Sequence, residues 1–295
     1  MMARMPFAAG VAVLIVITVL WGSTFVVVKD ALETIPVPLL LALRFSVAAA
    51  CFAFVRWDPR ALRPALVLGL LAFVGFATQT IGLSITTASK AAFITGLSVV
   101  LTPMVASVAT RTSVPGRAWA AAVVAVAGLA LMTLRGGEAA GVNVGDVVVL
   151  ACAFAYALYI VYLGRVAGDA NGLALAGVQH LPMAALAWLW AIPHLGALPT
   201  VPAATWAAVL YLAVVCTALI AVLQVYAQRV VPAHLAALIF VLEPVFAAAF
   251  AWGLLGERLG AAGWVGGALV VAAMALAELR PKRRAPVRAP ADARG

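Results

Sequence analysis

Apolar residues form ten long runs along this chain, and polar residues are largely confined to the short links between them. Each run has about 18–21 residues, the length that an α-helix needs to cross the hydrocarbon core of a bilayer. The pattern predicts an all-α integral membrane protein with ten transmembrane helices. The runs are roughly 9–28, 37–55, 65–84, 91–110, 117–134, 146–164, 173–192, 205–225, 233–252 and 261–279.

The first run follows a basic residue, Arg4, and in this respect it resembles a secretory signal peptide. It continues to about Val28, however, without a small-x-small cleavage site directly before Trp21. We therefore expect it to remain as the first transmembrane helix.

Lysine and arginine are distributed unevenly between alternate links. With the N-terminus placed inside, inside segments hold fourteen of these residues and outside segments hold four, while Arg44 lies within a span. Cytoplasmic links carry the excess of positive charge in membrane proteins. The count predicts a multi-pass protein of the bacterial inner membrane with both termini in the cytoplasm. Residues 281–295 are expected to form a basic, disordered cytoplasmic tail.

One segment occurs twice. Residues 82–103 and 223–244 have equal length and align without gaps at an offset of 141. The first copy ends in Pro103 and the second in Pro244. Proline lacks a backbone donor and allows a helix to bend, so both prolines are expected to act as hinges.

The repeat extends to other positions in the two halves. The aligned pairs are Arg44 with His180 and Trp21 with Tyr156. We expect one five-helix repeat over residues 1–135 and a second over residues 136–280. Because five is odd, the second repeat enters the membrane from the opposite side, as in many transporters whose site lies at the repeat interface.

Composition excludes several classes of protein. The chain is 66% hydrophobic and only 10% charged, so lipid rather than water must surround much of it. The net charge of +9 does not indicate nucleic-acid binding, because six of the nineteen basic residues lie in the last sixteen positions and no soluble domain is present to offer a basic face. The three cysteines lie in apolar runs without metal-ligand spacing, so no metal or cofactor is expected. Neither a phosphate-binding loop nor an HExxH motif occurs, which argues against an ATP-driven motor and against an enzyme.

Several stretches resemble the drug/metabolite transporter superfamily, and in particular its ten-helix EamA branch. They are WGSTFVVVKD (21–30), LALRF (41–45), ASKAAFITGLSVVLTP (88–103), GDVVVLACAFAYALYIVYLGR (145–165) and LEPVFAAAFAWGLLGER (242–258). The resemblance covers nearly the whole chain, and the Glu-Pro pair followed by LGER is typical of the branch but not of one substrate. Members include exporters of amino acids and related metabolites, and the resemblance implies that exporters of aromatic amino acids are the relatives to compare first.

Glu243, Arg44 and His180 lie well inside predicted spans, where an isolated charge costs about 2.5–3.5 kcal/mol. Glu243 either binds a proton or a substrate amine, or serves as a structural group bonded to helix ends. Arg44 either meets a substrate carboxylate through its planar fork or caps carbonyls of a neighbouring helix. His180 either contacts substrate or is a satisfied packing residue. Because Arg44 is expected to be the one deep cation, multiply charged anions are poor candidates for the cargo.

Uncharged residues add to the candidate site. Thr217, Gln224 and Gln228 share one helical face, and a polar stripe on a membrane helix avoids lipid. Gln79 and Gln224 are expected to line a cavity, whereas Thr95, Ser98 and Thr102 are expected mainly to satisfy the carbonyl that Pro103 frees. The predicted aromatic lining residues are Trp21, Tyr156 and Tyr159.

Three functions remain open at this point. The first is export of small amphipathic metabolites, with aromatic or other hydrophobic amino acids as the leading candidates. The second is proton-coupled export of lipophilic cations, and the third is a membrane enzyme or helper protein. The expected partners are a small-molecule substrate, the lipid bilayer and protons, without nucleic acid, and the chain is expected to be a monomer or a weak homodimer.

Overall fold

The computed structural model describes residues 6–56, 58–111, 113–114, 116–135, 141–166, 171–228, 230–231 and 239–278. The predicted tail therefore lies outside the described residues. Up to residue 135 the helices are α1 (Phe7–Ala31), α2 (Val37–Ala50), α3 (Pro59–Ile85), α4 (Ala88–Thr110) and α5 (Gly116–Arg135). Each corresponds to one predicted run.

The described residues beyond 135 are also mostly helical, but their helices are more often interrupted. They are α6 (Val144–Val166), α7 (Gly172–Val178), α8 (His180–Ala191), a 3₁₀ segment (Ile192–Thr200), α9 (Ala203–Leu210), a π-helical segment (Tyr211–Leu219), α10 (Ile220–Gln228), α12 (Glu243–Leu255) and α13 (Ala261–Glu278). Six helical segments of the described chain are long and apolar enough to cross a membrane, and four shorter apolar helices accompany them. The predicted all-α membrane fold is confirmed.

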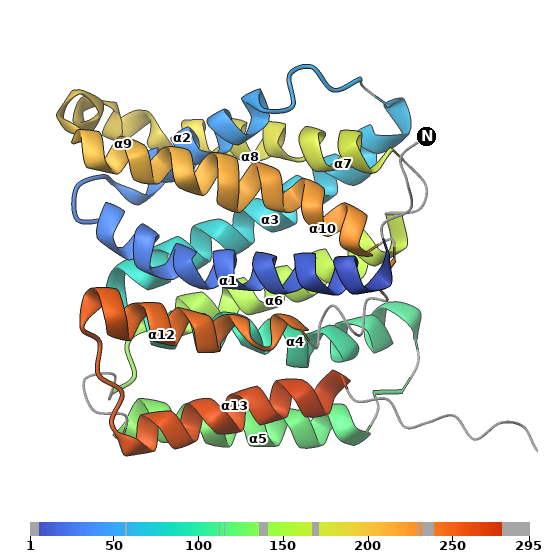
Figure 1. Cartoon of the computed structure of the whole chain (residues 1–295), viewed down its shortest axis with the longest axis vertical. Helices are drawn as coiled ribbons and strands as arrows, with labels where there is room; N and C mark the ends of the chain where they lie inside the picture. Colours follow the sequence, from blue (N-terminus) through green and yellow to red (C-terminus); the bar gives the residue numbers. More distant parts are fainter. Residues whose placement is uncertain are drawn as a thin grey trace, which may run out of the picture.

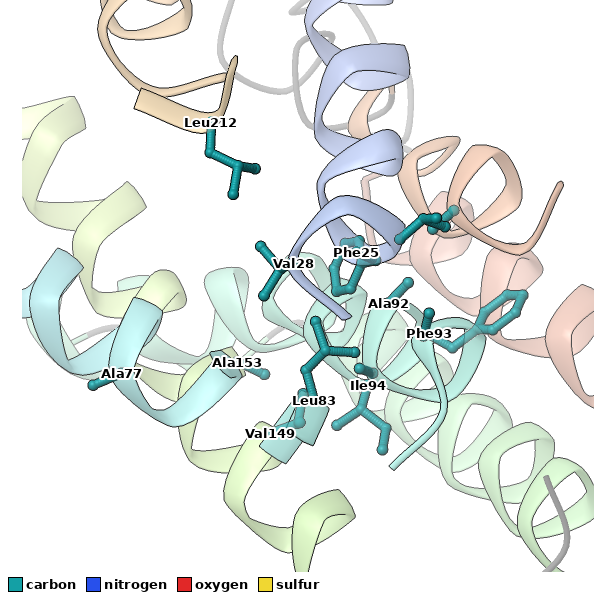
Figure 2. Packing of buried hydrophobic residues seen from close by; sticks show 14 of the residues in the cluster. Phe25, Val28, Ala77, Leu83, Ala92, Phe93, Ile94, Val149, Ala153 and Leu212 are labelled. Carbon is teal, nitrogen blue, oxygen red and sulfur yellow. The ribbon is translucent and has the colours of Figure 1, made fainter. Parts of the chain in front are cut away.

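Helices from distant parts of the sequence lie side by side (Figure 1). α5 packs against α13 at one edge of the molecule, and α2 packs against α8 at the other. Between them α1 contacts α12, and α6 contacts both α3 and α4. Figure 2 shows the buried centre, where Phe25 of α1, Leu83 of α3, Ile94 of α4 and Val149 of α6 come together.

The two repeat-end prolines differ in their surroundings. Pro103 lies inside the uninterrupted helix α4, whereas Val241 and Leu242 form a turn and Pro244 lies in the first turn of α12. The single helix expected across 233–252 is therefore broken before Glu243, and its first part falls partly outside the described residues. The physical reason is that proline, which cannot donate, is best tolerated where a helix begins.

The hydroxyl at the other proline also differs from expectation. Thr102 Oγ1 donates to the carbonyl of Ser98 at 2.7 Å. The carbonyl that Pro103 leaves without its helical donor is that of Val99, four residues before the proline. Thr102 therefore does not satisfy the freed carbonyl, contrary to the sequence-based expectation.

A polar contact joins the first turns of α3 and α7 outside the membrane-spanning segments. The Asp58 carboxylate accepts from the backbone N–H of Arg60 at 2.9 Å and from that of Asn171 at 3.0 Å. These bonds, together with the nearby Arg60 charge, lower the pKa of the Asp58 carboxyl. The contact ties residues from the two predicted halves together.

Glycines allow the closest helix crossings. At Gly22 of α1, an added Cβ would lie 2.8 Å from Cβ of Phe246 and 2.9 Å from the backbone nitrogen of Ala247 in α12. A Cβ added to Gly266 of α13 would likewise lie 2.5 Å from the Gly128 carbonyl oxygen of α5. A Cβ on Gly267 would lie 2.7 Å from the Phe93 ring, so this face of α13 serves internal packing.

Gly22→Ala is expected to destabilise the protein by about 1–3 kcal/mol, because the new Cβ meets backbone atoms that cannot move aside. Gly253→Ala on α12 is the matched control, since its Cβ would meet nothing within 4 Å. Thermal unfolding in detergent, followed by size-exclusion chromatography, measures both variants. Equal stability of Gly22→Ala and Gly253→Ala would show that α1 and α12 are not in close contact at Gly22.

Candidate functional site

A cavity lies among the helices of both predicted halves. It contains about 1090 Å³ of atom-free space, part of it continuous with solvent. Small-molecule sites are usually concave, mostly apolar and furnished with a few placed polar groups. The side chains that give this cavity its character are Trp21, Thr24, Arg44, Phe76, Gln79, Thr95, Ser98, Tyr156, Tyr159, Gln179, His180, Met183, Cys216, Thr217, Gln224, Phe240 and Glu243.

All eight residues that the sequence singled out for binding or coupling border this cavity. They are Trp21, Arg44, Gln79, Tyr156, Tyr159, His180, Gln224 and Glu243. The predicted hinges do not line it, although Pro244 lies 3.6 Å from the position that a Cβ on Gly96 would take at its wall.

Aromatic rings form two groups in the wall. Trp21 of α1 contacts Phe240, which precedes α12, with ring centroids 5.1 Å apart. Phe76 of α3 meets Tyr156 of α6 edge to face at 5.8 Å. Gly75 makes the second contact possible, because a Cβ there would lie 2.5 Å from the Tyr156 ring. The cavity therefore offers flat apolar surfaces from both halves.

Arg44 is the one Lys or Arg among the described residues that line the cavity. Its side chain is only 2% exposed, so it does not reach out to the membrane surface. Nε donates to Thr217 Oγ1 at 2.8 Å, and the guanidinium carbon lies 4.7 Å from the centroid of the Phe76 ring. No acidic side chain pairs with it in the part of the chain that the structure describes. The alternative that Arg44 caps carbonyls of a neighbouring helix is not observed among the described residues.

Glu243 is half-buried in the first turn of α12. The positive end of the helix dipole favours a carboxylate at this position. Within the described ranges its carboxylate makes no ion pair and no hydrogen bond. Glu243 is therefore available to a cation or a proton that enters the cavity.

His180 begins α8, directly after the break at Gln179. Its ring stacks on Phe52 at 5.5 Å, with 11° between the planes. Nδ1 is buried and meets no hydrogen-bond partner among the described residues. The residue thus combines a packing contact with an unused polar atom beside the cavity.

Two further hydrogen bonds join polar lining residues across helices. Gln79 Nε2 donates to Thr95 Oγ1 at 3.2 Å, joining α3 to α4. Tyr159 Oη donates to Gln179 Oε1 at 3.0 Å, joining α6 to the break between α7 and α8. These two bonds orient the four polar side chains at the cavity without using charged groups.

Comparison with known proteins decides the family. The EamA-like transporter family matches residues 8–134 and again residues 143–279. The chain belongs to the EamA-like transporter family. An uncharacterized transporter of Archaeoglobus fulgidus is 28% identical over 269 residues, which is 90% of this chain and 85% of the relative. The predicted EamA membership is confirmed, and the chain is a multi-pass membrane transporter.

A solved structure supports the fold of this EamA-like transporter. A crystal structure of a protein matches it with a TM-score of 0.64 and 20% identity, over 92% of this chain and 96% of that chain. The similarity concerns the fold alone. The finer resemblance to exporters of aromatic amino acids stays a prediction.

A second polar cluster in this EamA-like transporter lies at the N-terminal ends of α4 and α6. Lys90 Nζ pairs with Asp146 Oδ2 at 2.7 Å and donates to the Gly141 carbonyl at 2.7 Å. Asp146 Oδ1 accepts from Thr86 Oγ1 at 2.6 Å. The Lys90 side chain is 2% exposed, so a second cation besides Arg44 is buried, at the end of α4 and not at the cavity. The Asp146 partner neutralises Lys90, which explains how a second cation is buried.

Glu257, in the link between α12 and α13, closes the same end of α4. Its carboxylate accepts from the backbone N–H of Ala88 at 2.7 Å, from that of Ser89 at 3.0 Å and from Ser89 Oγ at 2.7 Å. An anion at a helix N-terminus satisfies donors that have no helical partner. The Glu of the LGER stretch thus has a structural role that the sequence reasoning did not find.

Sequence reasoning also missed lining residues. Phe76 and Phe240 border the cavity, as does Gln179. Phenylalanine in an apolar run carries no signal of its position, because the same residue packs equally well against lipid or protein. Gln179 did carry a signal, since a polar amide next to His180 in a predicted span is costly unless it faces protein.

Proposed function

We propose that the chain exports small amphipathic metabolites, with aromatic or other hydrophobic amino acids as the leading candidates. The observation that carries the proposal is the cavity itself, which combines one cation, one carboxylate and two groups of aromatic rings. An amino acid presents the complementary set: a carboxylate, an ammonium and an apolar side chain. In this proposal Arg44 binds the carboxylate and Glu243 the ammonium, while Trp21 and Tyr156 contact the side chain.

Transport is proposed to proceed by alternating access. Residues 1–135 and 136–280 are the moving halves, and the cavity at their interface lies near the bilayer midplane. Pro103 and Pro244 serve as the bending points, and Gln79, Tyr159, His180 and Gln224 line the path. The protein is placed in the bacterial inner membrane with both termini in the cytoplasm, in line with its fourteen-to-four distribution of basic residues.

The alternative is proton-coupled export of lipophilic cations. Glu243 supports it, because a carboxylate without a partner among the described residues, beside aromatic rings, suits a hydrophobic cation or a proton. In that case substrate and protons compete for Glu243.

Ligand-induced stabilisation distinguishes the two functions. A ligand at one hundred times its dissociation constant stabilises a protein by about 2.7 kcal/mol. We expect L-tryptophan or L-leucine to raise the unfolding temperature of the purified protein, and tetraphenylphosphonium to leave it unchanged. Stabilisation by the cation alone would support the alternative.

Glu243→Gln is expected to weaken amino-acid counterflow about tenfold, because a neutral amide is a poorer acceptor for an ammonium than a carboxylate. Counterflow in proteoliposomes at several pH values measures the effect. Glu33→Gln is the matched control, since Glu33 is exposed and does not line the cavity. Unchanged transport with an unchanged pH dependence would exclude both the ammonium-binding and the proton-carrying role.

A further inference from the structure

The segment Tyr211–Leu219 between α9 and α10 is π-helical over nine residues. π-Helical turns are rare and occur frequently at functional sites. Within this segment Thr217 Oγ1 donates to the Leu212 carbonyl, five residues earlier, at 2.7 Å. The wide turn therefore determines where the single hydroxyl proton of Thr217 points.

The direction of that proton determines how Arg44 is held. A hydroxyl has one proton, so Thr217 Oγ1 acts only as an acceptor toward Nε of Arg44, at 2.8 Å. The ring of Phe76 covers one face of the guanidinium, whose central carbon lies 4.7 Å from the ring centroid. Arg44 is thus fixed both at Nε and on one face.

The other end of Arg44 remains available. Nη1 and Nη2 donate to no described residue, and neither atom is sealed inside the protein. Arg44 borders the cavity, so the surface left to these atoms faces it. Because Nε is occupied, a planar anion has to approach end-on and accept from both Nη atoms.

We propose that Thr217 is a specificity-determining residue, which aims the terminal fork of Arg44 at the substrate carboxylate. The proposal rests on the proposed transport of amino acids and adds that the transporter recognises the substrate by its carboxylate. The transporter would accept carboxylates and reject the corresponding amides and amines. Thr217 acts through Arg44 and is a positioning residue.

The test measures competition in proteoliposomes that contain the full chain. Uptake of labelled L-tryptophan by counterflow is inhibited with L-tryptophan, L-tryptophanamide or tryptamine. In the wild-type protein we expect the acid to compete at least about tenfold better than the amide, since bonds to charged groups are worth about 1.5–3 kcal/mol. Equal competition by acid and amide in the wild type would overturn the proposal without reference to any variant.

Two variants then isolate Thr217. Thr217→Val keeps the shape and removes the acceptor, and we expect it to reduce the preference for acid over amide about tenfold while competition by the amide stays unchanged. Thr217→Ser keeps the acceptor and should retain the preference. Tryptophan transport with the same acid-to-amide ratio in Thr217→Val would overturn this inference alone. Absence of tryptophan counterflow in the wild-type protein would overturn the proposed amino-acid transport and this inference with it.

Discussion

Arg44→Ala is expected to weaken amino-acid uptake about a hundredfold, with the loss appearing mainly in the apparent affinity. The physical reason is that two charge-assisted hydrogen bonds to the carboxylate disappear, each worth about 1.5–3 kcal/mol before compensation. Counterflow at a series of substrate concentrations gives the apparent affinity. Arg44→Lys should have an apparent affinity between those of the wild type and Arg44→Ala, because lysine keeps the charge but loses the planar fork.

The control for this prediction separates binding from folding. Arg44 also donates a hydrogen bond to Thr217 and packs on the Phe76 ring, so its removal affects packing as well. The folded fraction of each variant is therefore measured by size-exclusion chromatography before transport. Arg60→Ala, at an exposed position outside the cavity, should leave transport unchanged. A folded Arg44→Ala protein with wild-type affinity would contradict the role of Arg44 in binding.

Lys90→Ala is expected to destabilise the folded protein by about 3–5 kcal/mol. Removing one partner of a buried ion pair leaves the other charge without compensation, and the Asp146 carboxylate is only 9% exposed. Reversible unfolding by denaturant in mixed micelles measures the change. Lys29→Ala is the comparison, since Lys29 is half-buried and donates to two carbonyls, and we expect a smaller loss of about 1–2 kcal/mol.

The double variant Lys90→Ala/Asp146→Ala tests whether the pair acts as a unit. Removal of both charges avoids a lone buried ion, so the double variant should lose less stability than the two single variants added together. Additive losses would show that the two residues stabilise the end of α4 independently.

The ten apolar runs predicted the membrane fold because lipid selects for length and hydropathy, and both can be counted in a sequence. Hydropathy carries no information about where a helix is interrupted. The break at Gln179, the π-helical turn at Thr217 and the start of α12 at Glu243 all lie inside continuous apolar runs. The start of α12 follows from Pro244, but the π-helical turn is joined to another helix by the bond from Arg44 to Thr217, which no single run reveals.

Part of the candidate site was predictable because a polar side chain in a membrane span is costly unless it faces the protein interior. Arg44, Gln79 and Glu243 stood out for that reason, and the structure brings them to one cavity. Lys90 stands directly before the run 91–110 and therefore outside every predicted span, yet its pairing with Asp146 allows it to be buried. Pairing of this kind becomes visible only when α4 and α6 are placed side by side.

Counterflow of labelled L-tryptophan in proteoliposomes is the most direct test of the central claim, that this cavity carries amino acids. The vesicles are loaded with unlabelled amino acid, and uptake is measured with and without an imposed pH gradient. We expect uptake without the gradient, competition by other aromatic amino acids, and loss of uptake in Arg44→Ala. No uptake under either condition, together with gradient-driven movement of tetraphenylphosphonium, would show that the cavity does not carry amino acids and would favour a cation–proton exporter.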